Sequence, residues 1–276
     1  MATPNSTRIL ILSDTHSSWP YNSAHPAPRA DIFLHCGDLT QVGGLASFKR
    51  AIADIKSIDA PLKLVIAGNH DLGLDEKWVR ENDESEEESL EESLEESREC
   101  VNYMKAQKEF GIHYLKEGVH EFELQDGKRV RVYASPYTPA FNGYTLAYGK
   151  DEDRFNKGDN AIPEGIDIVM THGPPLFPSN ENYGLDANQE GKHCGCEKLA
   201  SAMRRVKPRL HCFGHIHEGR GTARMAWESG EMSDGGEVNG VLPDVLQIGG
   251  DKSGGETLFL NAAVHNGAGC LVDIEL

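Results

Sequence analysis

Residues 8–16 read RILILSDTH, an apolar run that ends in polar side chains, among them an aspartate and a histidine. The same arrangement recurs along the chain. Runs such as ILIL (residues 9–12) and LVIA (residues 64–67) are apolar without alternation, which is typical of strands covered on both faces. The pattern predicts strands over residues 8–13, 31–36, 62–67, 129–134, 166–171, 209–213, 257–260 and 269–274.

Segments with helical periodicity lie between these runs. In residues 43–58, the apolar side chains of Leu45, Phe48, Ile52 and Ile55 fall on one helical face. Residues 196–208 show the same kind of spacing, and Pro208 ends that helix. Buried strands that alternate with helices predict an α/β fold. The sequence shows no linker and no long-period repeat, so we expect a single domain over residues 1–276.

The composition is that of a folded, acidic protein. The 276 residues are 38% hydrophobic and 26% charged, with 27 basic and 44 acidic side chains and a formal charge of −17. Affinity for nucleic acid comes from neutralising phosphates with Lys and Arg, so this charge argues against a nucleic-acid partner. No apolar stretch approaches the roughly 20 residues of a membrane span, so no membrane partner is expected. The N-terminus lacks a secretory signal pattern and six cysteines are typical of reduced thiols here, so we expect a cytoplasmic protein.

Much of the negative charge is concentrated in residues 81–99, ENDESEEESLEESLEESRE, which hold eleven acids and one arginine. Low hydrophobicity and dense like charge favour a solvated insertion that is disordered or forms a frayed helix. Serines among the acids leave a second interpretation open: a regulatory or phosphorylated arm, with a protein partner that the sequence does not identify.

Polar clusters follow five of the predicted strands. Because ligands bind beyond the carboxyl ends of strands in open α/β sheets, we expect the clusters to converge on one site. Their Asp, Asn and His side chains suit Mn²⁺, Fe, Zn²⁺ or Mg²⁺. Each cluster alone is a weak signal, but five in succession indicate a metal centre. The clusters are Ser13-Asp14-Thr15-His16, Cys36-Gly37-Asp38-Leu39, Gly68-Asn69-His70-Asp71, Thr171-His172-Gly173-Pro174-Pro175 and Gly214-His215-Ile216-His217.

This ordered set resembles the D-x-H, G-D, G-N-H-D/E, H and G-H-x-H motifs of the calcineurin-like metallophosphoesterase superfamily. The resemblance implies a four-layer α-β-β-α sandwich with a dinuclear metal site. It implies that one ion is bound by Asp14, His16 and His217, the other by Asn69, His172 and His215, and both by Asp38 as a bridge. His70 matches the family's histidine that is not a ligand and acts near the leaving oxygen, and Asp71 is expected to orient His70. The expected cofactors are two divalent ions, Mn²⁺ first, with Fe, Zn²⁺ or Mg²⁺ as alternatives.

The chemistry that the resemblance implies is phosphoester hydrolysis. Two such ions would lie about 3.5–4 Å apart and clamp the attacking and leaving oxygens of an in-line displacement. A water held between them loses a proton near neutral pH and becomes a bridging hydroxide, the nucleophile.

Further stretches are similar to the branch called metallophosphoesterase-domain-containing proteins, which is similar to class III cyclic-nucleotide phosphodiesterases. They include SPYTPAF (residues 135–141), GPP (173–175), GLD (184–186) and FLNAA (259–263). In that branch a Trp often follows the segment around Phe141, whereas this chain has Tyr144 nearby. The GHIH cluster keeps the first histidine that some relatives have lost, which favours a working enzyme.

Three side chains are candidates for contact with the substrate. Tyr137 and Phe141 can stack on a nucleobase or pack in the core or at its rim, and His193 can line the pocket. His193 also forms an H-C-x-C with Cys194 and Cys196. No second Cys/His pair with zinc-finger spacing lies nearby, so buried thiols at a helix start are the simpler interpretation.

We expect a phosphodiesterase acting on a small phosphoester, with cyclic nucleotides among the candidates. Protein phosphatases of the superfamily carry an Arg that grips phosphate in G-D-x-V-D-R-G, whereas residues 37–44 here read GDLTQVGG. A diester carries one negative charge and a monoester nearly two, so loss of the arginine affects diesters less. The alternatives are a phosphomonoesterase or protein phosphatase, a weakly catalytic scaffold with the same fold, and a nuclease, which the lack of a basic track argues against.

Overall fold

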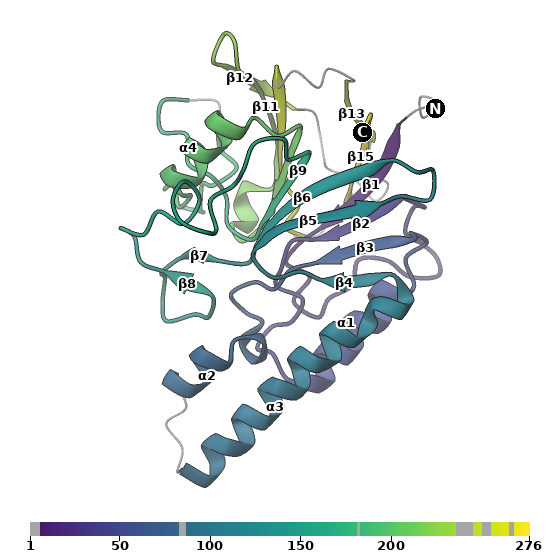
Figure 1. Cartoon of the computed structure of the whole chain (residues 1–276), viewed down its shortest axis with the longest axis vertical. Helices are drawn as coiled ribbons and strands as arrows, with labels where there is room; N and C mark the ends of the chain where they lie inside the picture. The colour runs from purple at the N-terminus through teal and green to yellow at the C-terminus, as the bar shows by residue number, and fades with distance from the viewer. Residues whose placement is uncertain (1–5, 83–86, 181–182, 236–244, 250–254, 265–267) are drawn as a thin grey trace.

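The computed structural model describes residues 6–82, 87–180, 183–235, 245–249, 255–264 and 268–276. Its first sheet has the strand order β13-β15-β1-β2-β3-β4 (Figure 1). The strands β1 to β4 run parallel, and Leu12, His35 and Val65 pair in register, so β1, β2 and β3 end side by side. The bounds are Val245–Ile248 (β13), Cys270–Ile274 (β15), Thr7–Leu12 (β1), Ile32–His35 (β2), Leu62–Val65 (β3) and Ile112–Tyr114 (β4).

The second sheet has the order β12-β11-β14-β10-β9-β6-β5. Its centre is parallel, because β6, β9, β10 and β14 pair in the same direction, while β5 and β11 join antiparallel. The bounds are Glu231–Asp234 (β12), Gly221–Ala226 (β11), Glu256–Asn261 (β14), Leu210–Phe213 (β10), Ile168–Thr171 (β9), Arg129–Ser135 (β6) and Gly118–Glu123 (β5). Thr138–Pro139 (β7) and Ala147–Tyr148 (β8) form a separate short pair.

The two sheets pack face to face between helices. Successive side chains of a strand point to opposite faces, so Ile9 and Ile11 of β1 enter the core between the sheets while Leu10 and Leu12 face outward. The outward face of the first sheet is covered by α1 (Leu45–Lys56) and by the end of α3 (Glu87–Lys105). The helix α4 (Glu197–Val206) covers the second sheet. The prediction of a four-layer α-β-β-α sandwich is confirmed.

All eight predicted strands are present, and both predicted helices match α1 and α4. The strands that the sequence did not reveal are short or half-exposed. The burial of β5, for example, alternates along the strand, unlike the wholly buried β2 and β10. The remaining elements are α2 (Glu76–Asn82) and the 3₁₀ turns η1 (Leu72–Leu74), η2 (Ala106–Phe110) and η3 (His217–Gly219).

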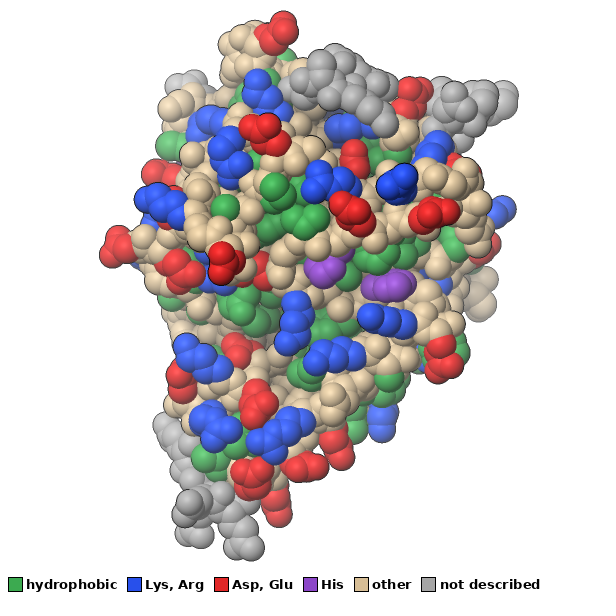
Figure 2. Space-filling view, in the orientation of Figure 1, with side chains coloured by type: hydrophobic (Ala, Val, Ile, Leu, Met, Phe, Trp, Pro, Cys, Tyr) green, Lys and Arg blue, Asp and Glu red, His purple; other side chains and the backbone are tan. Residues whose placement is uncertain are grey.

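The acidic insertion differs from its expected form. Residues 83–86 lie outside the described residues, but residues 87–99 belong to the 19-residue helix α3, so the expectation of a disordered or frayed segment is wrong there. Leu94, Cys100 and Met104 are fully or almost fully buried and hold the helix on the domain. Arg98 pairs with Glu76 of α2 at 3.1 Å, and Figure 2 shows acidic and basic side chains interleaved over this region. Neither α3 nor any other described helix is both long and apolar enough to cross a membrane.

Candidate metal centre

The predicted ligands lie in loops that directly follow parallel strands of both sheets. The loops after β1, β2 and β3 meet those after β9 and β10 at one edge of the sandwich, and hydrogen bonds join them. Across the two sheets, Nδ1 of His172 donates to the Cys36 carbonyl at 2.8 Å, and the His215 amide donates to the Asp14 carboxylate at 3.0 Å. Within the first sheet, the His70 amide donates to the Asp38 carboxylate at 2.8 Å. The five clusters predicted to converge therefore do converge.

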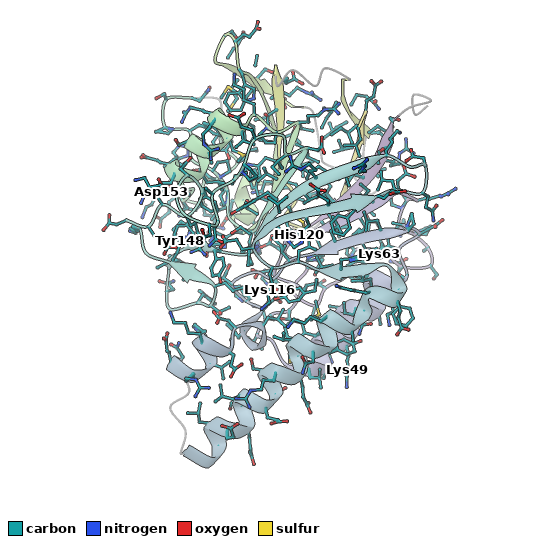
Figure 3. All side chains as sticks on the ribbon, viewed as in Figure 1. Lys49, Lys63, Lys116, His120, Tyr148 and Asp153 are labelled. Atoms are coloured by element: carbon teal, nitrogen blue, oxygen red, sulfur yellow. The ribbon has the colours of Figure 1, made fainter. Side chains whose placement is uncertain are left out.

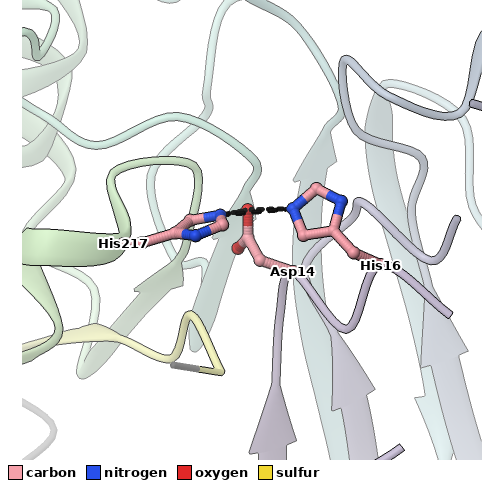
Figure 4. A group of neighbouring side chains, drawn as sticks. All are labelled: Asp14, His16 and His217. Atoms are coloured by element: carbon pink, nitrogen blue, oxygen red, sulfur yellow. Dashed lines mark hydrogen bonds and ion pairs between the residues drawn. The ribbon is translucent and has the colours of Figure 1, made fainter. Parts of the chain in front are cut away.

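Asp14, His16 and His217 form one group of neighbouring side chains (Figure 4). Nε2 of His217 lies 3.2 Å from Oδ1 of Asp14 and 3.2 Å from Nε2 of His16. Nε2 of His16 lies 4.0 Å from the same Asp14 oxygen. Two imidazole nitrogens and a carboxylate oxygen this close together can hold one divalent ion. We call this the outer group, because the side chains of His16 and His217 remain 15% and 33% exposed.

Asn69, His172 and His215 form the second group, which we call the inner group. Nε2 of His172 lies 2.8 Å from Oδ1 of Asn69, and the ring centroids of His172 and His215 are 5.1 Å apart. His172 is fully buried and Asn69 almost so. The backbone N–H of His215 donates to the Asp14 carboxylate at 3.0 Å, so the two groups share a hydrogen bond.

Asp38 lies between the two groups. Its Oδ2 is 3.6 Å from Nε2 of His16 and 3.5 Å from Nε2 of His172, so one carboxylate oxygen faces both. Its Oδ1 accepts a hydrogen bond from the backbone N–H of His70 at 2.8 Å, which fixes the carboxylate plane. This is the placement that a bridging ligand requires.

Backbone carbonyls orient two of the imidazoles. Nδ1 of His172 lies 2.8 Å from the Cys36 carbonyl, and Nδ1 of His16 lies 3.3 Å from the Thr40 carbonyl. A carbonyl can only accept, so in each ring Nδ1 carries the hydrogen. A metal ion would take the place of any hydrogen on Nε2, which leaves the Nδ1–H tautomer that metal-ligating histidines use.

The backbone at the centre is held in an unusual conformation. Positive φ is uncommon outside glycine and costs of order 1–3 kcal/mol when the surrounding structure enforces it. Such strain is concentrated at functional sites, and four of the seven predicted ligands show it. They are Asp14 (φ 57°), His16 (44°), Asp38 (55°) and His215 (69°).

Two glycines allow the ligands to pack this closely. A Cβ on Gly68 would collide with Oδ1 of Asp38 and lie 2.6 Å from Cε1 of His172. A Cβ on Gly214 would collide with Oδ2 of Asp14. The glycines of the GNHD and GHIH motifs are therefore needed for space beside the carboxylates.

The electrostatics of the cluster favour a cation. Burial raises the pKa of Asp14, but the hydrogen bond from His217 and the charge of His172 outweigh it, and the pKa lies below its usual value. The pKa of Asp38 is also lowered, because His172 outweighs the effect of burial. For His172, burial lowers the pKa but Asp38 raises it to about 9. The buried carboxylates thus stay ionised by binding a proton-bearing imidazole, a place that a divalent ion can take.

His70 lies beside the outer group, and one of its ring nitrogens lies within 4.8 Å of the ligand atoms of His16 and Asp38. Its Nδ1 donates to the Gln41 carbonyl at 2.8 Å, and its ring centroid lies 4.8 Å from that of His16. It lines an open pocket of about 590 Å³ together with Asp38, Asn69, His215 and His217. Nε2 of His70 is therefore the ring nitrogen left for a ligand in this pocket.

The structure assigns Asp71 a different place from the expected one. Its buried carboxylate accepts hydrogen bonds from the backbone N–H groups of Gly68, Leu39 and Thr40 at 2.9, 3.2 and 3.0 Å, and from the Thr40 hydroxyl at 2.9 Å. The His70 imidazole hydrogen bonds to the Gln41 carbonyl and not to Asp71. Asp71 therefore joins the loops after β2 and β3, and it acts on His70 through the backbone of residues 39–41.

Two of the three predicted substrate contacts line the pocket. Phe141 does, with 60% of its surface exposed, and His193 does too. Tyr137 does not: it lines a separate hollow, lies under the Arg154 guanidinium at 3.9 Å and packs against the core, which agrees with the packing alternative and not with a substrate contact in this pocket. Tyr144 takes that position, with its ring centroid 4.6 Å from that of His70.

His193 has a buried partner that the sequence interpretation missed. Its Nδ1 lies 2.7 Å from Oδ1 of Asp186, which is fully buried and also accepts from the Gly195 amide at 3.1 Å. The GLD stretch that contains Asp186 was the sequence feature that could have pointed to this partner of His193. Cys194 and Cys196 are free thiols, and Cys196 is the N-cap of α4, where its sulfur accepts from the Leu199 amide. The interpretation as thiols at a helix start agrees with this arrangement.

Comparison with known proteins adds the family context. A family model described as calcineurin-like phosphoesterase matches residues 7–219. Metallophosphoesterase domain-containing protein 1 of Homo sapiens is 34% identical over 224 residues, which cover 79% of this chain and 63% of that protein, and the Mus musculus protein gives the same values. Probable rhamnogalacturonate lyase C of Emericella nidulans is 28% identical over 82% of this chain and 18% of its own length. The chain thus spans less than two thirds of these relatives.

Proposed function

The chain belongs to the calcineurin-like phosphoesterase family, and on this premise we propose that it hydrolyses small phosphodiesters with two divalent metal ions. The observation that carries the proposal is the position of Asp38. One of its oxygens lies 3.6 Å from Nε2 of His16 in the outer group and 3.5 Å from Nε2 of His172 in the inner group. A carboxylate shared by two groups of nitrogen and oxygen donors suits a pair of ions.

The donor set fits such ions. The outer group would hold one ion, the inner group the other, and Asp38 would contact both. Carboxylate, amide and imidazole donors without a thiolate suit Mn²⁺, Fe, Zn²⁺ or Mg²⁺, and we propose Mn²⁺ as the first of these. When bound, the ions would lower the pKa of water and offset the charge of the phosphate.

His70 would assist departure of the leaving oxygen. Because the Gln41 carbonyl holds Nδ1, the ring cannot turn freely, and Nε2 is the nitrogen that, when protonated, would donate a hydrogen bond or a proton in the pocket. Asp71 would support this position through the hydrogen bonds that it accepts from residues 39 and 40. Asn69 would contribute a neutral oxygen, which leaves the inner position more electrophilic than a carboxylate would.

The pocket lining favours a diester over a monoester. Among the described residues, the lining contains lysines but no arginine. Bidentate hydrogen bonding of a guanidinium to a doubly charged phosphate is therefore not available there. Small diesters, cyclic nucleotides among them, carry one charge on the phosphate. The free state of all six cysteines supports the further proposal that the protein works in the cytoplasm.

The test is turnover of bis-p-nitrophenyl phosphate against p-nitrophenyl phosphate, using metal-stripped protein reloaded with Mn²⁺, Zn²⁺ or Mg²⁺. We expect metal-dependent turnover with the diester preferred. A strong preference for the monoester would instead support a phosphomonoesterase. Turnover unaffected by Asp38→Ala, together with protein binding that depends on the acidic helix α3, would support a scaffold.

A further inference from the structure

The pocket that holds the metal ligands also contains a basic wall. Lys150 follows β8, Lys192 precedes α4 and Lys198 lies in the first turn of α4, and all three line the same hollow of about 590 Å³. These segments are different from the loops that carry the metal ligands. Tyr148, labelled in Figure 3, lines the pocket beside the turn that contains Lys150.

The basic wall runs against the composition of the chain, which has a formal charge of −17. Some exposed lysines elsewhere pair with an acid close in sequence, such as Lys77 with Glu81 at 3.8 Å and Lys157 with Asp153 at 3.9 Å. Within the described ranges, no carboxylate lies within ion-pair distance of Lys150, Lys192 or Lys198. Apart from Asp38, Glu197 is the one acid among the lining residues that the structure describes.

The three lysines differ in whether their ammonium groups already have a hydrogen-bond partner. Nζ of Lys198 donates to the Lys150 carbonyl, so it joins the turn after β8 to the start of α4 and holds the wall in place. Lys150 and Lys192 are exposed at the pocket, and their ammonium groups remain available to a ligand. Phe141 and Tyr144 line the same hollow and offer aromatic faces to an uncharged planar group. The pocket volume is within the range of sites for small molecules, roughly 300–1,000 Å³.

We propose that this pocket selects small phosphodiesters that carry a second anionic group, which Lys150 and Lys192 bind. The proposal rests on the phosphodiesterase function proposed above, because the metal ligands would hold the scissile phosphate. A second phosphate on a nucleotide has the required chemistry: charge for the lysines and a base for the aromatic side chains. A diester without a second charge would leave the lysines without a partner.

The test compares two chromogenic esters that differ only in this group. They are the 5′-p-nitrophenyl ester of thymidine 5′-phosphate and the same ester of thymidine 3′,5′-bisphosphate. The kcat/KM ratio of the second to the first is measured for the wild type and for Lys150→Gln/Lys192→Gln. We expect a ratio of about ten or more in the wild type, mainly through KM, that falls toward one in the double variant, since a hydrogen bond to a charged group contributes about tenfold. A wild-type ratio near one, or a ratio unchanged by the double variant, would overturn the proposal.

A matched control and a binding measurement separate this proposal from the proposed function. Lys105→Gln/Lys116→Gln removes two exposed lysines from the separate hollow between α3 and the β4–β5 turn and should leave the ratio unchanged. Calorimetry then measures the Kd of thymidine 3′,5′-bisphosphate for metal-stripped protein. If no ester is cleaved with any metal, the phosphodiesterase function fails, and the calorimetry still decides the anion site. Binding weakened about tenfold in the double variant supports the site, and equal binding overturns it.

Discussion

The outer and inner groups present similar donors to very different surroundings. His16 and His217 of the outer group keep 15% and 33% of their side chains exposed, whereas His172 of the inner group has none. His172 is fixed by the Cys36 carbonyl on one side and by Asn69 on the other, both at 2.8 Å. The difference indicates that the inner group is held in place by burial and hydrogen bonds, while the outer group is open to solvent.

Each group is supported from beneath by a buried histidine–threonine pair. Nε2 of His35 in β2 lies 3.1 Å from the Thr15 hydroxyl, next to the outer group, and Nε2 of His211 in β10 lies 2.9 Å from the Thr171 hydroxyl, next to His172. The other ring nitrogen of each histidine is buried without a hydrogen-bond partner among the described atoms. The outer and inner groups therefore both lie next to a buried histidine–threonine pair, and they differ in their access to water.

The largest effect is expected from Asp38→Ala, which removes the oxygen common to both groups. Activity should fall by about 10³-fold or more, because in the proposed centre the positions of both ions would depend on this carboxylate. Metal analysis should show fewer than two equivalents bound. Asp38→Asn, which keeps the shape but removes the charge, separates loss of charge from loss of packing, and full activity in either variant would contradict the shared-ligand account.

His70→Gln tests the role of the histidine that lines the pocket beside the outer group. We expect kcat to fall by roughly 10²-fold through loss of proton or hydrogen-bond donation, with metal content unchanged. A metal content that falls in parallel with kcat would instead make His70 a ligand. Tyr144→Phe is the neighbouring control, because it keeps the ring that packs 4.6 Å from His70.

His172→Ala and His217→Ala compare the two groups directly. Removing the buried His172 leaves Asn69 and the Cys36 carbonyl without their partner, so the free energy of unfolding of the metal-free protein should fall by about 2–3 kcal/mol. His217 is partly exposed, and its loss should cost less than about 1 kcal/mol. Equal destabilisation in chemical denaturation would remove the distinction between a prebuilt inner group and an open outer group.

The last prediction concerns the pH dependence of stability that the two supporting histidines cause. Burial lowers the pKa of His35 to about 4 and of His211 to about 3, below the usual value of 6.5. The unfolded chain therefore takes up protons first, and stability present at neutral pH is lost as pH falls from about 6.5 toward these values, by about 2 kcal/mol per histidine at pH 5. His211→Gln should flatten this loss in metal-free protein, and an unchanged pH dependence would show that His211 titrates normally.

The features predicted from sequence were those with a dense local signal. The buried strands are continuous apolar runs, and the ligand clusters follow them at once, so both the layers and the convergence could be inferred. Order in α3 was missed because Leu94, Cys100 and Met104 are few among many acids, although they fall on one helical face. The hydrogen-bond partners of Asp71 could not be predicted from the sequence either, because they include backbone groups of a loop some thirty residues away.

The most direct test of the central claim is anomalous diffraction from crystals soaked in Mn²⁺. The account predicts two peaks, one within ligand distance of Asp14, His16 and His217 and the other within ligand distance of Asn69, His172 and His215, with Asp38 contacting both. A single peak, or peaks remote from Asp38 at saturating Mn²⁺, would contradict it.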